Sequence, residues 1–159
     1  MKILFICSSN ICRSPFCEYE FRRMVEECPE LAEIVTSVKS GAVKFRYRKI
    51  YEMTAQSLIA DGFTPEEVYA HKPRHKWFEK EVFEEADLII GMSHQHYVLL
   101  PRKWKHKYVN FTEYLFGEYK PVKDPWWERD LDQNGFNERM QELKQYLVLL
   151  KEKLLKERK

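Results

Sequence analysis

The stretch that decides the fold is Met1–Pro15, MKILFICSSNICRSP. Within it, Lys2–Ile6 is a short and largely apolar run bounded by small polar residues, which predicts a buried strand. Cys7–Ser14 is typical of a loop, and Pro15 has the fixed φ that favours the first turn of a helix. We therefore expect a strand, a loop and a helix in this order. The loop then lies at the carboxyl end of the strand, where open α/β sheets bind ligands.

Further predicted strands and helices alternate along the rest of the chain. The predicted strands lie at Glu33–Ser40, Glu67–Ala70 (short or merely extended), Asp87–Met92 and His106–Asn110. The predicted helices lie at Pro15–Glu27, Lys49–Asp61, Lys76–Glu85, Ser93–Leu100 and Gln133–Arg158, and residues 111–132 are expected to be irregular. The last helix has an apolar stripe at steps of three and four residues: Phe136, Met140, Leu143, Leu147, Leu150 and Leu154. The alternation predicts an α/β fold, a parallel sheet with helices on both faces.

The composition fits one domain that spans residues 1–159. Its 159 residues and 19.3 kDa are typical of a single domain with a sizeable core. A hydrophobic content of 44% excludes intrinsic disorder, and no apolar run approaches the roughly 18 residues of a membrane helix. The net charge of +2 gives no signal for nucleic-acid binding. The apolar stretch near Met1 is too short for a secretory signal, which predicts a cytoplasmic location.

All four cysteines lie within the first 28 residues: Cys7, Cys12, Cys17 and Cys28. A disulfide scaffold would distribute its cysteines over the chain, and these spacings do not match the usual zinc patterns. Cys17 and Cys28 are expected to pack on a helix face. His94 and His96 have no second ligand pair nearby and are expected on the surface of a helix. We therefore expect neither a metal nor another cofactor, and the clustering indicates a local role of cysteine near the N-terminus.

The Cys7–Ser14 loop has the pattern Cys-x5-Arg between a strand and a helix. Small polar residues let the backbone curl so that successive N–H groups point inward, and the helix N-terminus adds unsatisfied donors. Arg13 supplies a planar fork for two phosphate oxygens, and Ser14 can donate a hydrogen bond to the thiolate. Such surroundings favour the nucleophilic thiolate of Cys7. We predict that a phosphoryl group is transferred to Cys7 and that the phosphocysteine is then hydrolysed.

The leaving oxygen of this reaction needs a proton from a general acid, and the chain has only five aspartates. Four of them fit structural positions at the ends of predicted elements: Asp61, Asp87, Asp130 and Asp132. Asp124 instead lies in the segment KDPWW, where Pro125 restrains it to extended conformations. The two tryptophans that follow can line a pocket for a flat substrate ring. Asp124 is therefore the candidate general acid.

The loop motif Cys7–Pro15, together with Asp124-Pro125 late in the chain, resembles the low-molecular-weight protein tyrosine phosphatase family. The resemblance covers essentially the whole chain, and the segments Ser40–Val43 and His71–Arg74 are also similar to family segments. It implies a three-layer sandwich around a four-stranded parallel sheet in the order 2-1-3-4. It also implies a metal-independent phosphatase that hydrolyses phosphotyrosine through a cysteinyl phosphate.

The resemblance implies a role for each site residue. Cys7 is the nucleophile, Arg13 clamps the phosphate, and Asp124 is the general acid. Ser14 completes the catalytic set. The expected substrate-binding residues are Ser8, Ser9, Asn10, Ile11, Cys12, Trp126 and Tyr47. The polar network that supports the loop consists of Asn10, Ser14, Ser40 and His71. Cys12 is also a redox partner that can form a reversible disulfide with the nucleophile.

The resemblance also implies the ligands and the form of the protein. We expect it to bind a phosphotyrosine-containing protein or peptide, and inorganic phosphate, sulfate or vanadate at the loop. We expect no nucleic acid and no membrane as partners, and a monomer or weak dimer.

Three departures from the family pattern affect the site. Ser9 stands where the family usually has Gly, and Ser93 stands where it usually has an Asp that braces the loop. The family's second specificity aromatic falls on Arg46 by simple counting, so Phe45 or Tyr47 would have to serve. Basic residues at positions 44, 46, 48 and 49 suit an acidic phosphopeptide, although a solvated loop also explains them.

Three alternatives remain open. A protein-arginine phosphatase belongs to the same family, but that branch favours a Thr where this chain has Ile11, because a hydroxyl can orient attack on the guanidino phosphate. A thioredoxin-coupled arsenate reductase needs further cysteines, and none follows Cys28. A non-catalytic phosphate-binding or phosphoprotein-binding module would not need Cys7, Arg13 and Asp124 together.

Overall fold

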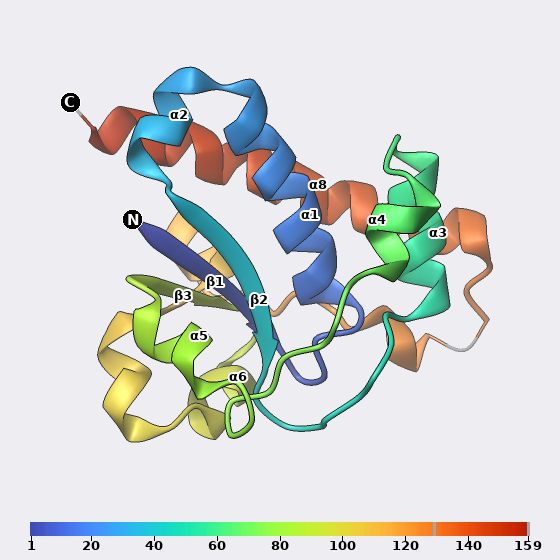
Figure 1. Cartoon of the computed structure of the whole chain (residues 1–159), viewed down its shortest axis with the longest axis horizontal. Coiled ribbons are helices and arrows are strands. Elements are labelled where there is room, and N and C mark those ends of the chain that lie inside the picture. Colours follow the sequence, from blue (N-terminus) through green and yellow to red (C-terminus); the bar gives the residue numbers. More distant parts are fainter. Residues whose placement is uncertain (129, 159) are drawn as a thin grey trace.

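Four parallel strands form the middle layer of the molecule in the computed structural model (Figure 1). The strands are β1 (Lys2–Cys7), β2 (Ser37–Ala42), β3 (Leu88–Gly91) and β4 (Tyr108–Asn110), in the order β2-β1-β3-β4. The structure describes residues 1–128 and 130–158. Residues 129 and 159, which the predicted ranges 111–132 and 1–159 include, lie outside the described residues. The predicted parallel sheet and its strand order are confirmed.

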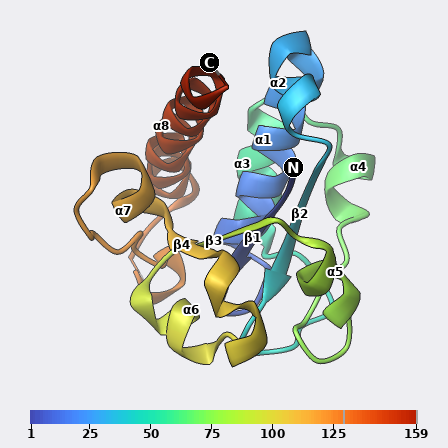
Figure 2. The ribbon, with the colours of Figure 1, turned by 90° about the vertical axis from the view of Figure 1, so that its left-hand side faces the viewer.

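Helices cover both faces of this sheet (Figure 2). The helices are α1 (Arg13–Glu27), α2 (Pro29–Ile34), α3 (Glu52–Ala60), α4 (Pro65–Tyr69), α5 (Lys80–Glu85), α6 (His94–Leu99), α7 (Phe111–Phe116) and α8 (Gln133–Glu157). Short 3-10 helices, η1 (Arg102–Lys107) and η2 (Pro125–Trp127), complete the described elements. On one face α1 packs against β1, β2 and α8, and on the other α5 packs against β1 and β2. No helix in the described part of the chain is long and apolar enough to cross a membrane.

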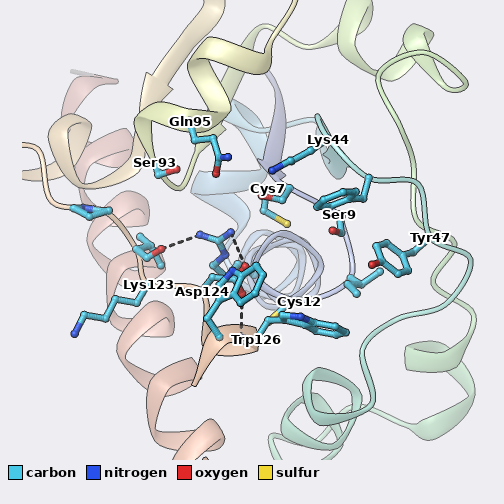
Figure 3. Close-up of a pocket in the computed structure, with 17 residues that line it drawn as sticks. Cys7, Ser9, Cys12, Lys44, Tyr47, Ser93, Gln95, Lys123, Asp124 and Trp126 are labelled. Atoms are coloured by element: carbon cyan, nitrogen blue, oxygen red, sulfur yellow. Dashed lines mark hydrogen bonds and ion pairs between the residues drawn. The ribbon is translucent and has the colours of Figure 1, made fainter. Parts of the chain in front are cut away.

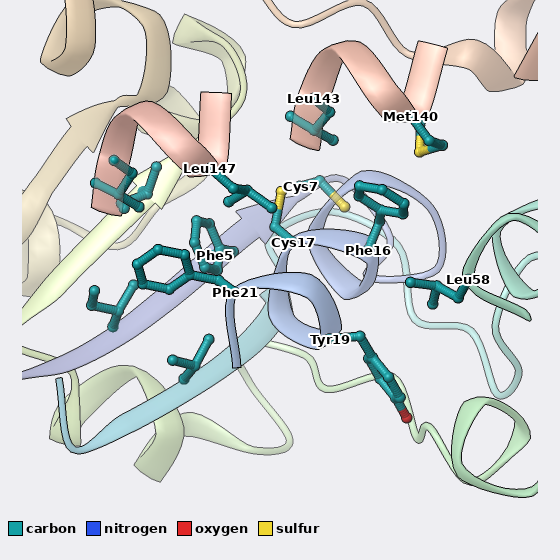
Figure 4. Close-up of a cluster of buried hydrophobic side chains, with 14 of the residues drawn as sticks. Phe5, Cys7, Phe16, Cys17, Tyr19, Phe21, Leu58, Met140, Leu143 and Leu147 are labelled. Atoms are coloured by element: carbon teal, nitrogen blue, oxygen red, sulfur yellow. The ribbon is translucent and has the colours of Figure 1, made fainter. Parts of the chain in front are cut away.

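The central strand β1 is buried on both faces, which explains why its sequence is a continuous apolar run rather than an alternating one. Ile3, Phe5 and Cys7 belong to the core beneath α1 and α8, whereas Leu4 and Ile6 belong to the core beneath α5. In the first core the rings of Phe5 and Phe21 pack edge to face at a centroid distance of 5.9 Å (Figure 4). Rigid packing on both faces fixes the end of β1, where the loop begins.

The long C-terminal helix α8 closes the first core. All six residues of its predicted stripe, from Phe136 to Leu154, are buried. Figure 4 shows Met140, Leu143 and Leu147 above the residues of β1 and α1. The predicted amphipathic helix is therefore confirmed, and it holds α1 against the sheet.

Several predicted boundaries are wrong, and each has a physical reason. Glu67–Ala70 is not a strand, because Thr64 and Glu67 form a capping box that starts α4. Glu33 and Ile34 end the helix α2 rather than begin a strand, since a proline occupies its first turn. The segment predicted to be irregular begins with α7, whose N-terminus is capped by the side chain of Asn110.

Candidate active site

The loop between β1 and α1 curls around a buried asparagine. Asn10 has φ 56°, a left-handed conformation that Asn tolerates better than most residues. Its amide Nδ2 donates to Ser14 Oγ at 2.9 Å, and its Oδ1 accepts from the N–H of Arg74 at 2.9 Å. The carbonyl of Asn10 only accepts, so His71 Nε2 donates the hydrogen of their 2.9 Å contact. The side chain of Asn10 is fully buried and holds the loop from behind, and binding of substrate by Asn10 remains a prediction.

A hydrogen bond joins Ser14 to the predicted nucleophile. Ser14 Oγ lies 2.8 Å from Cys7 Sγ, and both residues are buried. Because Asn10 donates to Ser14 Oγ, the hydroxyl hydrogen of Ser14 is free to point at the sulfur. The asparagine therefore orients a donor toward the atom on which negative charge would develop.

Ser40 supports the loop through Glu18, a residue that was not predicted from the sequence. Ser40 Oγ donates to the buried Glu18 carboxylate at 2.6 Å, and Arg74 Nη1 donates to the same oxygen at 3.0 Å. Arg74 in turn holds Asn10 through its backbone N–H. Glu18 is 3% exposed on the inner side of α1, so an acid among apolar neighbours was the signal available in the sequence.

Arg13 lies between the loop and the segment that carries the candidate acid. Its Nη1 donates to the Val122 carbonyl at 2.8 Å, and its Nη2 lies 3.4 Å from Asp124 Oδ2. Its Nε is buried and has no hydrogen-bond partner among residues 1–128 and 130–158. Asp124 Oδ1 accepts from the Trp126 N–H at 3.1 Å, which caps η2. A buried guanidinium with an unused donor is a strong position for an oxyanion.

These residues surround one cavity of about 530 Å³ (Figure 3). The predicted site residues that line it are Cys7, Ser8, Ser9, Ile11, Cys12, Arg13, Tyr47, Asp124 and Trp126. Four other lining residues were also considered from the sequence, namely Lys44, Phe45, Ser93 and Trp127. The sequence did not point to the remaining ones, which are Gln95, Pro121, Val122 and Lys123. In Figure 3 the sulfur of Cys7 lies at the centre, with Tyr47 and Trp126 on one side and Ser93 and Gln95 across from them. The cavity thus has an aromatic wall and a polar wall.

The aromatic wall contains both candidates for the second specificity aromatic. Phe45 and Tyr47 line the cavity and meet edge to face at 6.3 Å, whereas Arg46 lies over the ring of Phe78 at 3.8 Å. Trp126 is braced from behind by Tyr51, whose ring centroid is 4.9 Å away. A flat substrate ring can therefore enter between exposed aromatic side chains.

The two histidines predicted on a helix surface differ in burial. His94 is exposed, but His96 is fully buried, so the prediction is wrong for His96. Its ring is enclosed behind Ser8 and the end of β3, because a residue at the third position of α6 points back over the helix start.

Cys12 is also largely buried, at 5% exposure. Burial raises the pKa of its thiol to about 12, so it is a neutral thiol at ordinary pH. The redox pairing of Cys12 with Cys7 remains a prediction.

The chain is similar to known phosphatases in sequence and in fold. The family model of the low molecular weight phosphotyrosine protein phosphatases matches residues 2–159. A protein-arginine-phosphatase of Bacillus subtilis is 26% identical over 135 residues, covering 79% of this chain and 80% of that protein. A low molecular weight protein-tyrosine-phosphatase of Streptomyces coelicolor is 26% identical over 101 residues, covering 64% of this chain and 58% of that protein. The solution structure of a low molecular weight protein tyrosine phosphatase from Bacillus subtilis has a TM-score of 0.78 and 26% identity, covering 100% of both chains.

Proposed function

Because the chain belongs to the low-molecular-weight phosphotyrosine protein phosphatase family, we propose that it hydrolyses phosphotyrosine in proteins or peptides through a phosphocysteine at Cys7. The observation that carries the proposal is the buried Arg13 Nε, a donor without a partner in the described chain, beside a cysteine that already receives a hydrogen bond. Both groups line one cavity with Asp124. An aryl phosphate fits this arrangement of charge and aromatic surface.

In the first step the Cys7 thiolate attacks phosphorus, so an S–P bond forms as the P–O bond to the tyrosine ring breaks. The electron pair of that bond leaves with the phenolic oxygen, and Asp124, as the general acid, transfers a proton to this oxygen. Arg13 binds two of the equatorial phosphate oxygens, and its present contacts with Val122 and Asp124 keep the guanidinium in that orientation. The products of this step are the dephosphorylated tyrosine and a phosphocysteine at Cys7.

In the second step Asp124, now a carboxylate, takes a proton from a water that attacks phosphorus. The S–P bond breaks, and its electron pair returns to Cys7 as a thiolate, while inorganic phosphate leaves. Ser14 donates a hydrogen bond to the sulfur and thereby stabilises the thiolate. Inorganic phosphate, sulfate and vanadate are therefore expected to bind in the same loop as inhibitors.

A second candidate, hydrolysis of phosphoarginine in proteins, is favoured by one specific observation. A relative at 26% identity is named a protein-arginine-phosphatase. Ile11 favours phosphotyrosine as the substrate, because its apolar side chain lines the cavity and offers no hydrogen-bond partner to a guanidino group. The aromatic wall of Tyr47 and Trp126 also suits a ring better than a flexible polar chain.

The rim of the cavity favours an acidic peptide around the phosphotyrosine. Lys44 and Lys123 line the cavity, and the segment 44–49, which contains Arg46, Arg48 and Lys49, is exposed throughout. Lysines at an opening attract negatively charged substrate residues and speed their encounter. We also propose a cytoplasmic location, because the reaction needs a reduced Cys7 thiol and the cytosol keeps thiols reduced. A monomer or weak dimer remains our expectation.

Turnover of phosphotyrosyl, phosphoarginyl and phosphoseryl peptides in the presence of a chelator tests the proposal. The wild type should prefer the phosphotyrosyl peptide, vanadate should inhibit it, and Cys7→Ser should abolish turnover. Preference for the phosphoarginyl peptide would support the second candidate. Absence of vanadate-sensitive turnover on all three would favour a non-catalytic phosphate-binding module, and near-normal turnover by Cys7→Ser would refute the phosphocysteine.

A further inference from the structure

The residue after the nucleophile is held by a buried histidine that the catalytic scheme does not use. Ser8 lines the cavity, and its Oγ lies 3.3 Å from Nε2 of His96. His96 is fully buried on α6, 88 residues further along the chain. Burial of a polar ring is unfavourable unless its nitrogens are hydrogen-bonded. The partners of the two ring nitrogens therefore show which nitrogen donates and which accepts.

The hydrogen bonds of His96 determine which nitrogen carries the hydrogen. Its Nδ1 lies 3.0 Å from the N–H of Met92 and 3.2 Å from the N–H of Ser93. Both are donors, so Nδ1 must accept and Nε2 must carry the hydrogen of a neutral ring. Burial, aided by the positive charge of Arg13, lowers the pKa of His96 to about 3, which keeps the ring neutral. His96 Nε2 is therefore the donor toward Ser8.

This direction leaves the hydroxyl hydrogen of Ser8 available to the cavity. Ser8 Oγ accepts from His96 and has no other hydrogen-bond partner in the part of the chain that the structure describes. A hydroxyl that accepts one bond still has one hydrogen to donate. Beside Cys7 and Arg13, a bound oxyanion is the acceptor that such a hydrogen would meet.

We propose that the Ser8 hydroxyl is a further oxyanion-binding donor of the loop, and that His96 is a positioning residue that orients it by donating a hydrogen bond to its oxygen. The proposal rests on the proposed function, because it assigns these two residues to the same phosphate site.

The test is a double-mutant cycle with two complementary histidine variants. Ser8→Ala removes the hydroxyl, and Ser8→Thr restores it. His96→Asn keeps an acceptor near the position of Nδ1 but loses the donor at Nε2, whereas His96→Gln keeps a donor near Nε2 but loses that acceptor. The readouts are kcat/KM for p-nitrophenyl phosphate, the inhibition constant of vanadate, and the melting temperature of each variant.

We expect Ser8→Ala to weaken vanadate inhibition and lower kcat/KM by about tenfold, as for loss of one hydrogen bond to a charged group. Ser8→Thr should recover most of this loss. His96→Asn should lose about threefold to tenfold in both readouts, and His96→Gln should lose less, although its melting temperature falls further. In the double variant Ser8→Ala/His96→Asn the loss should not exceed that of Ser8→Ala alone, because one donor is removed in both cases.

The proposal is overturned if Ser8→Ala stays within twofold of the wild type in both readouts. The role of His96 is overturned if the losses of the two single variants multiply in the double variant, or if His96→Asn changes only the melting temperature. If the wild type does not hydrolyse p-nitrophenyl phosphate, the proposed function fails on its own. Binding of vanadate to the same set of variants, measured by calorimetry, then still tests whether Ser8 and His96 form an oxyanion site.

Discussion

Replacement of Ser14 by Ala removes the hydrogen bond that Cys7, the proposed nucleophile, receives. Ser14 Oγ lies 2.8 Å from Cys7 Sγ, and its exposure is 0%. A hydrogen bond to a charged group contributes about 1.5–3 kcal/mol, and in this buried setting water cannot replace it. That range corresponds to a loss of roughly tenfold to 150-fold in a rate that depends on the thiolate.

The loss should be largest in hydrolysis of the phosphocysteine, because the thiolate is the leaving group of that step. Rapid mixing with p-nitrophenyl phosphate separates the two steps, since formation of the phosphocysteine releases p-nitrophenol at once. Ser14→Ala should therefore show a burst that approaches one equivalent, followed by a slow steady state. The variant should also unfold more easily, by about 1–3 kcal/mol, because the amide of Asn10 loses its buried acceptor.

A matched control is Ser57→Ala on α3. Ser57 is also buried, at 2% exposure, but its Oγ has no hydrogen-bond partner among the described residues. Its removal should leave turnover unchanged and stability nearly so. A Ser14→Ala variant with kcat within threefold of the wild type and no burst would refute the role of Ser14 as a donor to sulfur. Equal losses for Ser14→Ala and Ser57→Ala would attribute the effect to packing.

Three further predictions address selectivity and stability. Ile11→Thr should raise the ratio of phosphoarginyl to phosphotyrosyl turnover by about fivefold, the effect of one new hydrogen bond; an unchanged ratio in competition assays would exclude Ile11 from this choice. Lys44→Glu should raise KM several-fold more for an acidic than for a neutral phosphotyrosyl peptide, and high salt should abolish the difference; equal effects at all ionic strengths would rule out steering. Burial raises the pKa of Glu20, on α1, from 4.5 to about 8. The folded protein therefore holds this proton more tightly than the unfolded chain, and the free energy of unfolding should fall as the pH rises between these values, by up to about 1.4 kcal/mol per pH unit. Urea unfolding of the wild type and of Glu20→Gln at several pH values measures this, and identical slopes would refute the assignment.

Local patterns in the sequence predict the frame of the molecule well. The apolar run of β1, the loop and the proline of α1 follow from residues that are neighbours in the chain. The stripe of α8 follows from spacing alone, and every residue of it is buried. These features depend on the period of apolar residues and on backbone preferences, which a single sequence contains.

Features that depend on contacts between distant segments could not be read in the same way. The burial of Glu18 and His96 depends on which elements cover them, and the carbonyl of Val122 that accepts from Arg13 has no sequence signal. The missed helix α4 is different, because Thr64, Pro65 and Glu67 form a helix start that can be read from neighbouring residues in the sequence. Burial that depends on distant contacts cannot be predicted from a local pattern, whereas a local helix start can be.

The loop is anchored from both strands that flank β1, and this explains why its motif alone does not make a site. From the β2 side, Ser40 contacts Glu18, which holds Arg74 and through it the amide of Asn10. From the β3 side, the turn after Gly91 contacts the loop through His96.

That same turn also fixes the segment of the candidate acid. The Met92 carbonyl accepts from the Val122 N–H at 2.9 Å, and the Val122 carbonyl accepts from Arg13. A shift of β3 would therefore move Ser8, Arg13 and the acid segment together. Because β1 is an interior strand, between β2 and β3, its carboxyl end is a position where supports from two sides can meet under one loop. A Cys-x5-Arg sequence placed at an edge strand would have the same residues and only one of the two supports.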